Sequence, residues 1–310
     1  MTVYLGVDGG GTKTEFVGID EHGDVLARAL TGTTYHLEVG LEEVLVRIAQ
    51  GVGSICSTLG IEAGALGYVF LGLPAFGEDA RVDPLLVASV LPVLGHGRYR
   101  CDNDMVCGWA GSLACADGIN LVAGTGSIAY GERQGHGARV GGWGEMFSDE
   151  GSAYWIAIQG LQAFTRMSDG RQQRGPLHRI VSNALSLDGD LAICARVMGE
   201  NGMTRGEIAA LAPLVSEAAD AGDPAAAAIL DRAGTELADI AHALRRKLEF
   251  RDDERTALSW SGGVLTKQAA VRAALLRDLE ARDLFDVVMP RHDPGVGAAL
   301  YARLLASRNC

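Results

Sequence analysis

The sequence predicts an α/β fold built as two related halves, and three observations support this. β-rich stretches alternate with stretches in which apolar residues recur at helical spacing. Each half begins with two β-rich stretches joined by a glycine-rich turn, DGGGT at residues 8–12 and AGTGS at residues 123–127. Glycine makes up 42 of the 310 residues, about twice its usual share, which indicates many tight turns. We expect two domains at this length and place them at residues 1–115 and 116–310.

The first half is expected to follow the order strand, strand, strand, helix, strand, helix, strand, helix. Three short β-rich stretches come first, and apolar residues spaced by three and four then predict a helix from Leu41 to about Leu59. A continuous apolar run follows that is typical of a buried parallel strand. The expected strands are 3–8, 16–20, 25–30, 66–73 and 98–102, and the later helices are 84–94 and a segment from about 105.

The second half repeats the opening hairpin and then becomes largely helical. Its expected strands are 119–123, 128–131, 139–143, 256–261 and 284–289. Thr204 with Glu207 has the spacing of a capping box, and Asp223 precedes a proline at the first position of a long predicted helix. A final helix is expected from Asp293-Pro294 to about residue 305.

Composition excludes several classes of function. The net charge is −12, only three residues are lysine, and no basic run occurs, so binding to nucleic acid or to an anionic membrane surface is not expected. No apolar run reaches the roughly 18 residues of a membrane span, and no secretory signal is visible. We therefore expect a cytoplasmic protein whose six cysteines are reduced. Neither C-x-x-C nor H-E-x-x-H spacing occurs, so protein-ligated zinc is not expected.

The turn GVDGGGTKT at residues 6–14 is close to a P-loop but differs from it in spacing and in context. A P-loop needs a glycine directly followed by lysine, whereas Thr12 stands between Gly11 and Lys13. A P-loop also leads into a helix, and the residues after this turn are typical of a strand. Backbone N–H groups of a glycine-rich turn still bind anions, and threonine hydroxyls add donors. We expect a phosphate site of another kind, with a ligand-free hairpin as the alternative.

Three motifs in chain order resemble those of the N-acetylglucosamine kinases and the wider BadF/BadG-type ATPases. They are DGGGTKT at 8–14, GTGS at 124–127 and GGWGEMFSDEGSAYW at 141–155, of which the third is the most specific. The resemblance covers nearly the whole chain, although residues 165–255 carry little of the pattern. It implies membership in the superfamily of actin, hexokinase and the large heat-shock ATPases. The implied fold class is α/β, with two ribonuclease-H-like (actin-like ATPase) domains that hold ATP and a sugar in an interdomain cleft.

The resemblance implies which residues hold the cofactors ATP and Mg²⁺. Gly262-Gly263 would lie against the adenosine, and Asp8 would orient Mg²⁺ through water. The implied phosphate contacts are Gly10, Gly11, Thr12 and Lys13 in the first turn, and Gly124, Thr125 and Gly126 in the second.

The resemblance also implies that Asp104 is the catalytic base. Phosphoryl transfer requires positioning, Mg²⁺ and an acceptor for the proton of the attacking hydroxyl, and an aspartate can supply the last. In RYRCDNDMVCGWAGS the position after the strand and before a helix is Asp104. Asp102 is a rival because it lies two residues away, and a simple helix N-cap is the alternative role for Asp104.

The sugar is expected to contact the third motif and the loop after the third strand. The resemblance implies contacts from Gly142, Trp143, Gly144 and Asp149. One departure matters: the family has an asparagine that reads the substituents of the sugar, and here Thr33-Thr34 stand in that region. Thr34 offers a single hydroxyl in place of an amide, so the swap is expected to alter substrate choice. His36 is expected to be an exposed loop residue or to supply a compensating contact.

Taken together, the sequence predicts an ATP-dependent kinase that phosphorylates the 6-hydroxyl of N-acetylglucosamine or glucosamine, and we expect a homodimer. One alternative is an activator ATPase of a radical dehydratase, which would need cysteines that ligate an iron–sulfur cluster. Cys101, Cys107 and Cys115 instead have the pattern of small buried residues. The other alternative is a non-catalytic sugar or nucleotide sensor, although a DNA-binding segment is not expected before the first strand at Val3.

Overall fold

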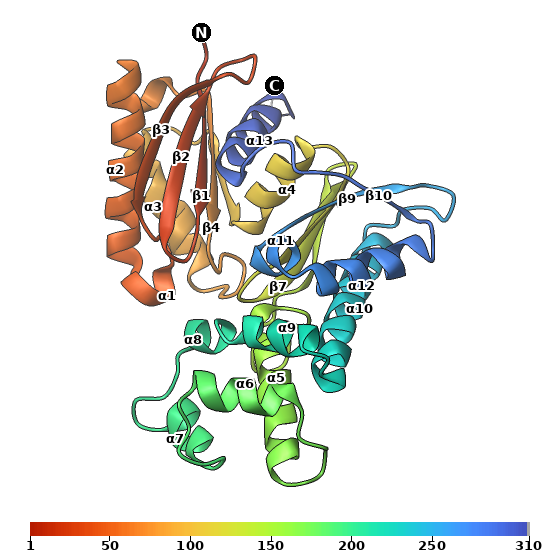
Figure 1. Cartoon of the computed structure of the whole chain (residues 1–310). Coiled ribbons are helices and arrows are strands. Elements are labelled where there is room, and N and C mark those ends of the chain that lie inside the picture. Colours follow the sequence, from red (N-terminus) through yellow and green to blue (C-terminus); the bar gives the residue numbers. More distant parts are fainter. Residues whose placement is uncertain (309–310) are drawn as a thin grey trace. The chain divides into compact units, whose positions relative to one another are not determined.

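The computed structural model describes residues 1–308, which form two compact units (Figure 1). Unit 1 contains Met1–Gly118 together with the C-terminal segment from Met289, and unit 2 contains Ile119–Val288. The expected domains, 1–115 and 116–310, differ from these units chiefly in the C-terminal segment. Helix α13 (Pro294–Arg308) packs against strands and a helix of the first half, so it belongs to unit 1. As a division into domains, the expected boundary stays a prediction.

Unit 1 is built on a five-stranded mixed sheet with the order β3-β2-β1-β4-β5. Strands β1, β2 and β3 pair antiparallel, and β4 and β5 extend the sheet in parallel from β1. The register places Asp8 opposite Glu15 and beside Gly72. The bounds are β1 Tyr4–Gly9, β2 Lys13–Ile19, β3 Val25–Gly32, β4 Tyr68–Leu73 and β5 Tyr99–Asn103.

Helices cover both faces of this sheet (Figure 1). On one face the apolar stripe of α2, including Val44 and Ile48, packs with Phe16 in a fully buried cluster. On the other face α13 lies so close to β1 that a Cβ at Gly6 would be 2.7 Å from the Cβ of Ala298. The helices are α1 His36–Val39, α2 Leu41–Leu59, the 3₁₀ helix Ala63–Ala65, α3 Asp83–Leu94 and α4 Met105–Leu113.

Unit 2 repeats the same sheet plan. Its order, β10-β9-β6-β7-β8, again places the first strand at the centre with the second and third on one side and the fourth and fifth on the other. The bounds are β6 Gly118–Ala123, β7 Ser127–Arg133, β8 His136–Gly141, β9 Thr256–Ser261 and β10 Phe285–Val287. The internal repeat and the α/β fold class expected from the sequence are confirmed. The third strand ends at Gly141, two residues earlier than expected, so Trp143 lies in a loop.

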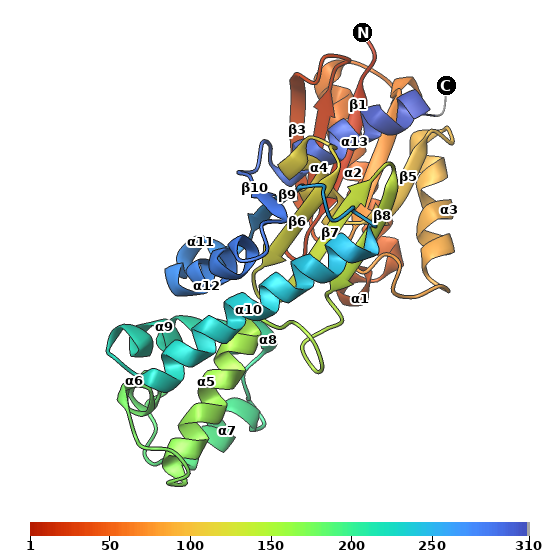
Figure 2. The ribbon, with the colours of Figure 1, turned by 90° about the vertical axis from the view of Figure 1, so that its right-hand side faces the viewer.

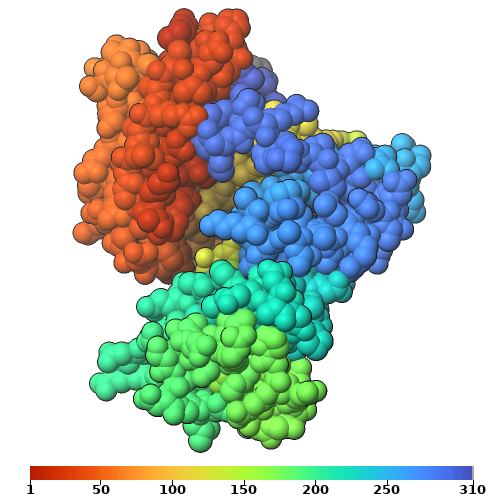
Figure 3. Space-filling model, in the orientation of Figure 1, coloured from red at the N-terminus to blue at the C-terminus, as the bar shows by residue number. Residues whose placement is uncertain are grey.

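Unit 2 also contains a helical body that the sheet plan does not require. Helices α6, α8 and α9 pack against α5 in the green part of Figure 3, and the long α10 lies along β7, β8 and α12 (Figure 2). The expected capping box of Thr204 and Glu207 is confirmed, as is the cap of α10 by Asp223. The bounds are α5 Ala153–Ser168, α6 Pro176–Ala184, α7 Ala192–Met198, α8 Arg205–Ala209, α9 Ala212–Asp220, α10 Pro224–Lys247, α11 Gly263–Lys267 and α12 Ala269–Glu280.

Candidate active site

The first glycine-rich turn joins β1 to β2, which confirms a strand–turn–strand context rather than a P-loop. The Gly10 N–H donates to the carbonyl of Lys13 (2.9 Å) and closes the turn. The hydroxyl of Thr33, at the end of β3, donates to the Gly10 carbonyl (2.7 Å) and braces the turn from outside. A Cβ at Gly11 would meet no atom within 4 Å, so the turn presents open backbone. The predicted residues line a pocket of about 240 Å³ here, in which Glu15 joins Asp8, Gly10, Gly11, Thr12 and Lys13.

Asp8 lies near the end of β1 in this pocket and is only partly buried. Burial, with smaller contributions from the negative charges of Glu15 and Asp293, raises its pKa to about 6, while a hydrogen bond with Cys107 acts in the opposite direction. A carboxyl group crowded by other carboxylates gains from a cation, and Mg²⁺ characteristically takes one or two protein carboxylates and completes its shell with phosphates and waters. Asp8 beside an open glycine turn therefore fits Mg²⁺.

Asp104 stands between β5 and α4, as expected, and its carboxyl is unusual. Burial, followed by the negative charge of Asp8, raises its pKa to about 7. Asp104 occupies the residue before α4 but makes no side-chain capping hydrogen bond, so the N-cap alternative is not supported. The rival Asp102 forms an ion pair with Arg100 (2.5 Å). Of these two carboxylates, Asp104 is the one without an arginine partner.

Asn103 is a residue that the sequence reasoning missed. Its side-chain amide donates to the Phe76 carbonyl (3.0 Å), and its side-chain oxygen accepts from the Met105 N–H (3.2 Å). These two bonds hold the start of α4 and thereby the backbone of Asp104. The sequence did offer a signal for it, because Asn103 stands between two aspartates at the end of a strand. Asn and Asp side chains at such positions commonly form hydrogen bonds with the neighbouring backbone.

The loop after β3 differs from expectation in its burial. Thr34 is only 1% exposed, and the Thr14 hydroxyl donates to its hydroxyl oxygen (3.1 Å). The neighbouring Thr33 braces the glycine turn and accepts from the Tyr35 N–H (3.0 Å). The expectation that His36 is exposed is wrong: the residue is buried, and its Nδ1 has no hydrogen-bond partner. The reason is that α1 begins at His36 and turns the imidazole inward, which the short polar loop did not indicate.

The second glycine-rich turn, in unit 2, joins β6 to β7 and is fastened to the start of α5. The Ala153 N–H donates to the Gly124 carbonyl (2.9 Å), and the Ser127 hydroxyl donates to the Glu150 carbonyl (2.7 Å). A pocket of about 610 Å³ opens beside the turn, a size suited to a nucleoside. Three of the predicted residues, Gly124, Thr125 and Gly263, line this pocket together with residues of α8, α9 and α11, including Lys267. The predicted Gly126 and Gly262 are not among its lining residues.

Gly262 has a separate structural reason to be glycine. Its φ is +98°, and a Cβ would collide with the carbonyl of Ala123 at the end of β6. The chain can therefore turn from β9 into α11 only with glycine at this position. The turn holds Gly263 at the edge of the nucleoside-sized pocket.

The third motif forms an irregular loop. Gly141, Gly142 and Gly144 all have positive φ, and Trp143 is 65% exposed beneath the guanidinium of Arg139 (5.1 Å to the ring centroid). Trp143 lines a pocket of about 400 Å³ with Phe147 and part of α10, whereas Asp149 is 2% exposed and does not line it. The structure thus does not bring Trp143 and Asp149 into one pocket.

Asp149 is engaged with the second turn. One carboxylate oxygen accepts from the Ser127 N–H (3.3 Å), and the other pairs with Arg205 Nη2 (2.6 Å). Arg205 was not among the predicted residues. Nothing in the local pattern indicates it, because it lies 56 residues from Asp149.

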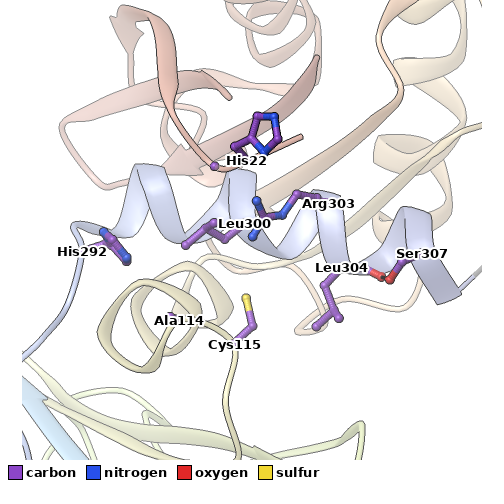
Figure 4. A pocket seen from close by; sticks show the side chains of 9 residues that line it. His22, Ala114, Cys115, His292, Leu300, Arg303, Leu304 and Ser307 are labelled. Carbon is purple, nitrogen blue, oxygen red and sulfur yellow. Dashed lines mark hydrogen bonds between the residues drawn. The ribbon is translucent and has the colours of Figure 1, made fainter. Parts of the chain in front are cut away.

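A further pocket of about 420 Å³ lies in unit 1, along α13, and contains none of the predicted site residues (Figure 4). It is lined by His22, Gly23, Ala114, Cys115, His292, Leu300, Arg303, Leu304 and Ser307. Cys115 faces this pocket, while Cys101 and Cys107 are buried and burial raises the pKa of both thiols.

Residues 1–308 contain neither a membrane-spanning helix nor a ready-made metal cluster. No helix in this part of the chain is long and apolar enough to cross a membrane. Within the same range, no group of three or more His, Cys, Asp and Glu side chains is placed to hold a metal ion by itself.

The chain is similar over nearly its whole length to amino-sugar kinases. It is 28% identical to an N-acetyl-D-glucosamine kinase of Dictyostelium discoideum, with 97% of each chain covered. It is 27% identical to an N-acetylmuramic acid/N-acetylglucosamine kinase of Clostridium acetobutylicum, with 98% of this chain and 99% of the relative covered. A solved structure from Chromobacterium violaceum, provisionally assigned as an N-acetylglucosamine kinase, superposes with a TM-score of 0.73 at 27% identity and covers 99% of both chains.

The family pattern extends over both units. The sequence profile of the BadF/BadG/BcrA/BcrD ATPase family matches residues 5–302, which include both glycine-rich turns, Asp104 and the third motif. The chain belongs to the BadF/BadG/BcrA/BcrD ATPase family.

Proposed function

We propose that the protein is an ATP-dependent amino-sugar kinase that transfers the γ-phosphate of ATP to the 6-hydroxyl of N-acetylglucosamine or glucosamine. The observation that carries the proposal is Asp104, a partly buried carboxyl with a pKa of about 7 at the strand end where a kinase base is expected; within residues 1–308 it has no arginine partner. Two amino-sugar kinases, to which the chain is similar over nearly their full length, support the substrate class.

In this reaction Asp104 accepts the proton of the 6-hydroxyl as the oxygen attacks the γ-phosphate. A base works best when its pKa lies near the working pH, and burial raises the pKa of Asp104 to about 7. A positioned base of this kind contributes roughly 10²- to 10⁴-fold to the rate. Asn103 accepts from the Met105 N–H and so holds the backbone directly after this proton acceptor.

The nucleotide contacts are proposed for both glycine-rich turns. In unit 1 the turn residues Gly10, Gly11 and Thr12 and the side chain of Lys13 would contact phosphate oxygens, and Asp8 would hold Mg²⁺. The open backbone of this turn is at Gly11, since the Gly10 N–H is already used within the turn. When bound, Mg²⁺ neutralises phosphate charge during transfer. In unit 2 the turn Gly124–Gly126 binds phosphate, and the adjoining pocket, which Gly263 lines and Gly262 shapes, takes the nucleoside.

The sugar contacts remain those expected from the third motif, namely Gly142, Trp143, Gly144 and Asp149, together with Thr34. For Thr34 and Asp149 the structure adds a condition, because both side chains are buried and already hydrogen-bonded. Either residue would act on the sugar through the backbone or after a local rearrangement. Replacement of the family asparagine by a buried threonine hydroxyl is the feature we propose to shift substrate choice.

The alternatives receive no comparable support. An activator ATPase would ligate iron–sulfur clusters through thiolates, and the buried Cys101 and Cys107 thiols have pKa values raised by burial. The expected homodimer stays a prediction, which multi-angle light scattering tests directly.

The test is ADP release by the purified protein with Mg-ATP and a panel of N-acetylglucosamine, glucosamine, N-acetylmannosamine, N-acetylmuramic acid and glucose. We expect turnover with one or both of the first two. Asp104→Asn should lose turnover by roughly 10²-fold or more while ADP still binds. Asp102→Asn is the matched control two residues away and should retain most of the activity. If Asp102→Asn loses turnover and Asp104→Asn keeps it, Asp102 is the base. If none of the five sugars stimulates ADP release, the proposed function is refuted.

A further inference from the structure

The guanidinium of Arg205 lies against the second glycine-rich turn. A Cβ built at Gly126 would lie 2.7 Å from Arg205 Nη2 and 2.9 Å from Asp149 Oδ2, so the guanidinium rests directly over the glycine. Gly126 thus leaves space for an arginine to reach the turn. Arg205 itself is the first residue of α8, which follows the capping box that begins at Thr204.

The guanidinium is held by two carboxylates of different character. Asp149 Oδ2 lies 2.6 Å from Nη2, and its side chain is 3% exposed and also accepts from the Ser127 N–H. Glu145 Oε2 lies 3.1 Å from Nε, and its side chain is 40% exposed in a loop whose next residues, Met146 and Phe147, are also exposed. The Arg205 side chain is itself 43% exposed, so the two pairs differ in their carboxylates: a buried carboxylate left without its partner is costly, whereas an exposed pair contributes little. Asp149 is therefore a fixed anchor for Arg205, and Glu145 is an exchangeable partner.

The position of Arg205 relates it to the nucleoside-sized pocket of unit 2. Gly206, the next residue, lines that pocket together with Gly124 and Thr125. A nucleoside in the pocket would direct its phosphates toward the turn, where Arg205 reaches Gly126. A guanidinium binds phosphate oxygens in a two-pronged geometry and is weakly hydrated, which suits it to this role better than an ammonium group.

We propose that Arg205 is a phosphate-binding residue of the nucleotide site: a phosphate oxygen of the nucleotide replaces Glu145 on the guanidinium, while Asp149 keeps the guanidinium over the turn. The inference rests on the nucleotide use proposed above and adds a charged side chain to the second glycine-rich turn, whose own residues, AGTGS, carry none. It also gives Asp149 a positioning role in nucleotide binding, independent of any contact with sugar.

The exchange makes Glu145 a competitor of the nucleotide. The carboxylates of Glu145 and Asp149 face the same guanidinium, that of Arg205. Bound phosphate would therefore meet the negative charge of Glu145, and removal of that charge should favour binding. Glu145→Gln and Arg205→Met thus have opposite expected effects on the same ligand, which a general loss of structure does not produce.

The experiment compares two ligands that differ only in phosphate. Isothermal titration calorimetry measures ADP and adenosine binding, at constant Mg²⁺, to the wild type and to Arg205→Met, Arg205→Lys and Glu145→Gln. We expect Arg205→Met to weaken ADP by roughly 10- to 100-fold with adenosine unchanged, and Arg205→Lys to recover part of the loss. Glu145→Gln should tighten ADP by a few fold, as the loss of one exposed charge–charge interaction implies. The matched control Arg171→Met, which removes an exposed arginine paired with Asp169, should change neither ligand.

Two results would overturn the inference. One is a loss of ADP and adenosine affinity by the same factor in Arg205→Met with no recovery in Arg205→Lys, because that would show a structural role only. The other is unchanged ADP affinity in both Arg205→Met and Glu145→Gln while the wild type binds ADP. Failure of the wild type to bind ADP is a different outcome, since it refutes the proposed nucleotide use itself. Should Arg205→Met not fold, Arg205→Lys and Glu145→Gln still decide the question.

Discussion

Replacing Asp104 by asparagine should stabilise the ligand-free protein, and the stabilisation should grow with pH. Burial and the charge of Asp8 raise the pKa of Asp104 from 3.8 to about 7 in the folded protein. A carboxyl whose pKa is raised by folding binds its proton more tightly in the folded state, so stability falls as pH rises from the unfolded pKa to the folded pKa. Asparagine has the same shape and no charge, so it removes this cost.

The magnitude follows from the size of the pKa shift. A rise of about 3 units corresponds to roughly 4 kcal/mol, at about 1.4 kcal/mol per unit, and the cost is complete above about pH 7. At about pH 5.5 only about half of it is present, so the difference between about pH 5.5 and pH 8 is roughly 2 kcal/mol. Because Asp104 is only partly buried, we expect roughly 1–2 kcal/mol of extra stabilisation at the higher pH.

Urea denaturation of the wild type and Asp104→Asn at the two pH values, in EDTA and without nucleotide, measures this quantity. Asp102→Asn is the control, because its carboxylate is paired with Arg100 and its loss should not stabilise the protein at high pH. An Asp104→Asn effect that is equal at the two pH values, or a destabilisation that grows with pH, would refute the claim that ionisation of this carboxyl destabilises the folded protein. A pH-dependent gain together with lost turnover would identify Asp104 as a residue whose charge serves function at the expense of stability.

The remaining predictions concern packing and the metal. Gly6→Ala should lower the free energy of unfolding by roughly 1–3 kcal/mol, because its Cβ would enter the interface of β1 with α13. The control Gly53→Ala in α2, where a Cβ meets no atom within 4 Å, should raise the free energy of unfolding by roughly 0.5–1 kcal/mol. Denaturant unfolding measures both variants, and equal effects would contradict the packing argument. Asp8→Asn should raise the Mg²⁺ concentration for half-maximal turnover by roughly tenfold or more, with the sugar KM unchanged; an unchanged Mg²⁺ titration would remove Asp8 from the metal site.

Much of the fold could be predicted because its signals are local. Apolar periodicity distinguishes strands from helices within a few residues, and the caps at Thr204 and Asp223 depend on residues within one helical turn. The repeated glycine-rich hairpin indicated the repeated sheet, and the strand after the first turn excluded a P-loop. The ion pair of Arg100 and Asp102 is local as well, since the two residues lie two positions apart on one face of a strand.

The sequence by itself therefore determined the class of the protein. It indicated the types of the elements, the β-hairpin that opens each sheet, the glycine-rich turns, and Asp104 directly after β5. Only the tertiary structure decided which side chains are available. It buried Thr34 and His36, left Trp143 exposed, joined α13 to the first half and paired Asp149 with Arg205 across 56 residues. The physical reason is that burial and ion pairing depend on atoms brought together by distant segments, whereas periodicity, turn chemistry and capping depend on neighbours along the chain.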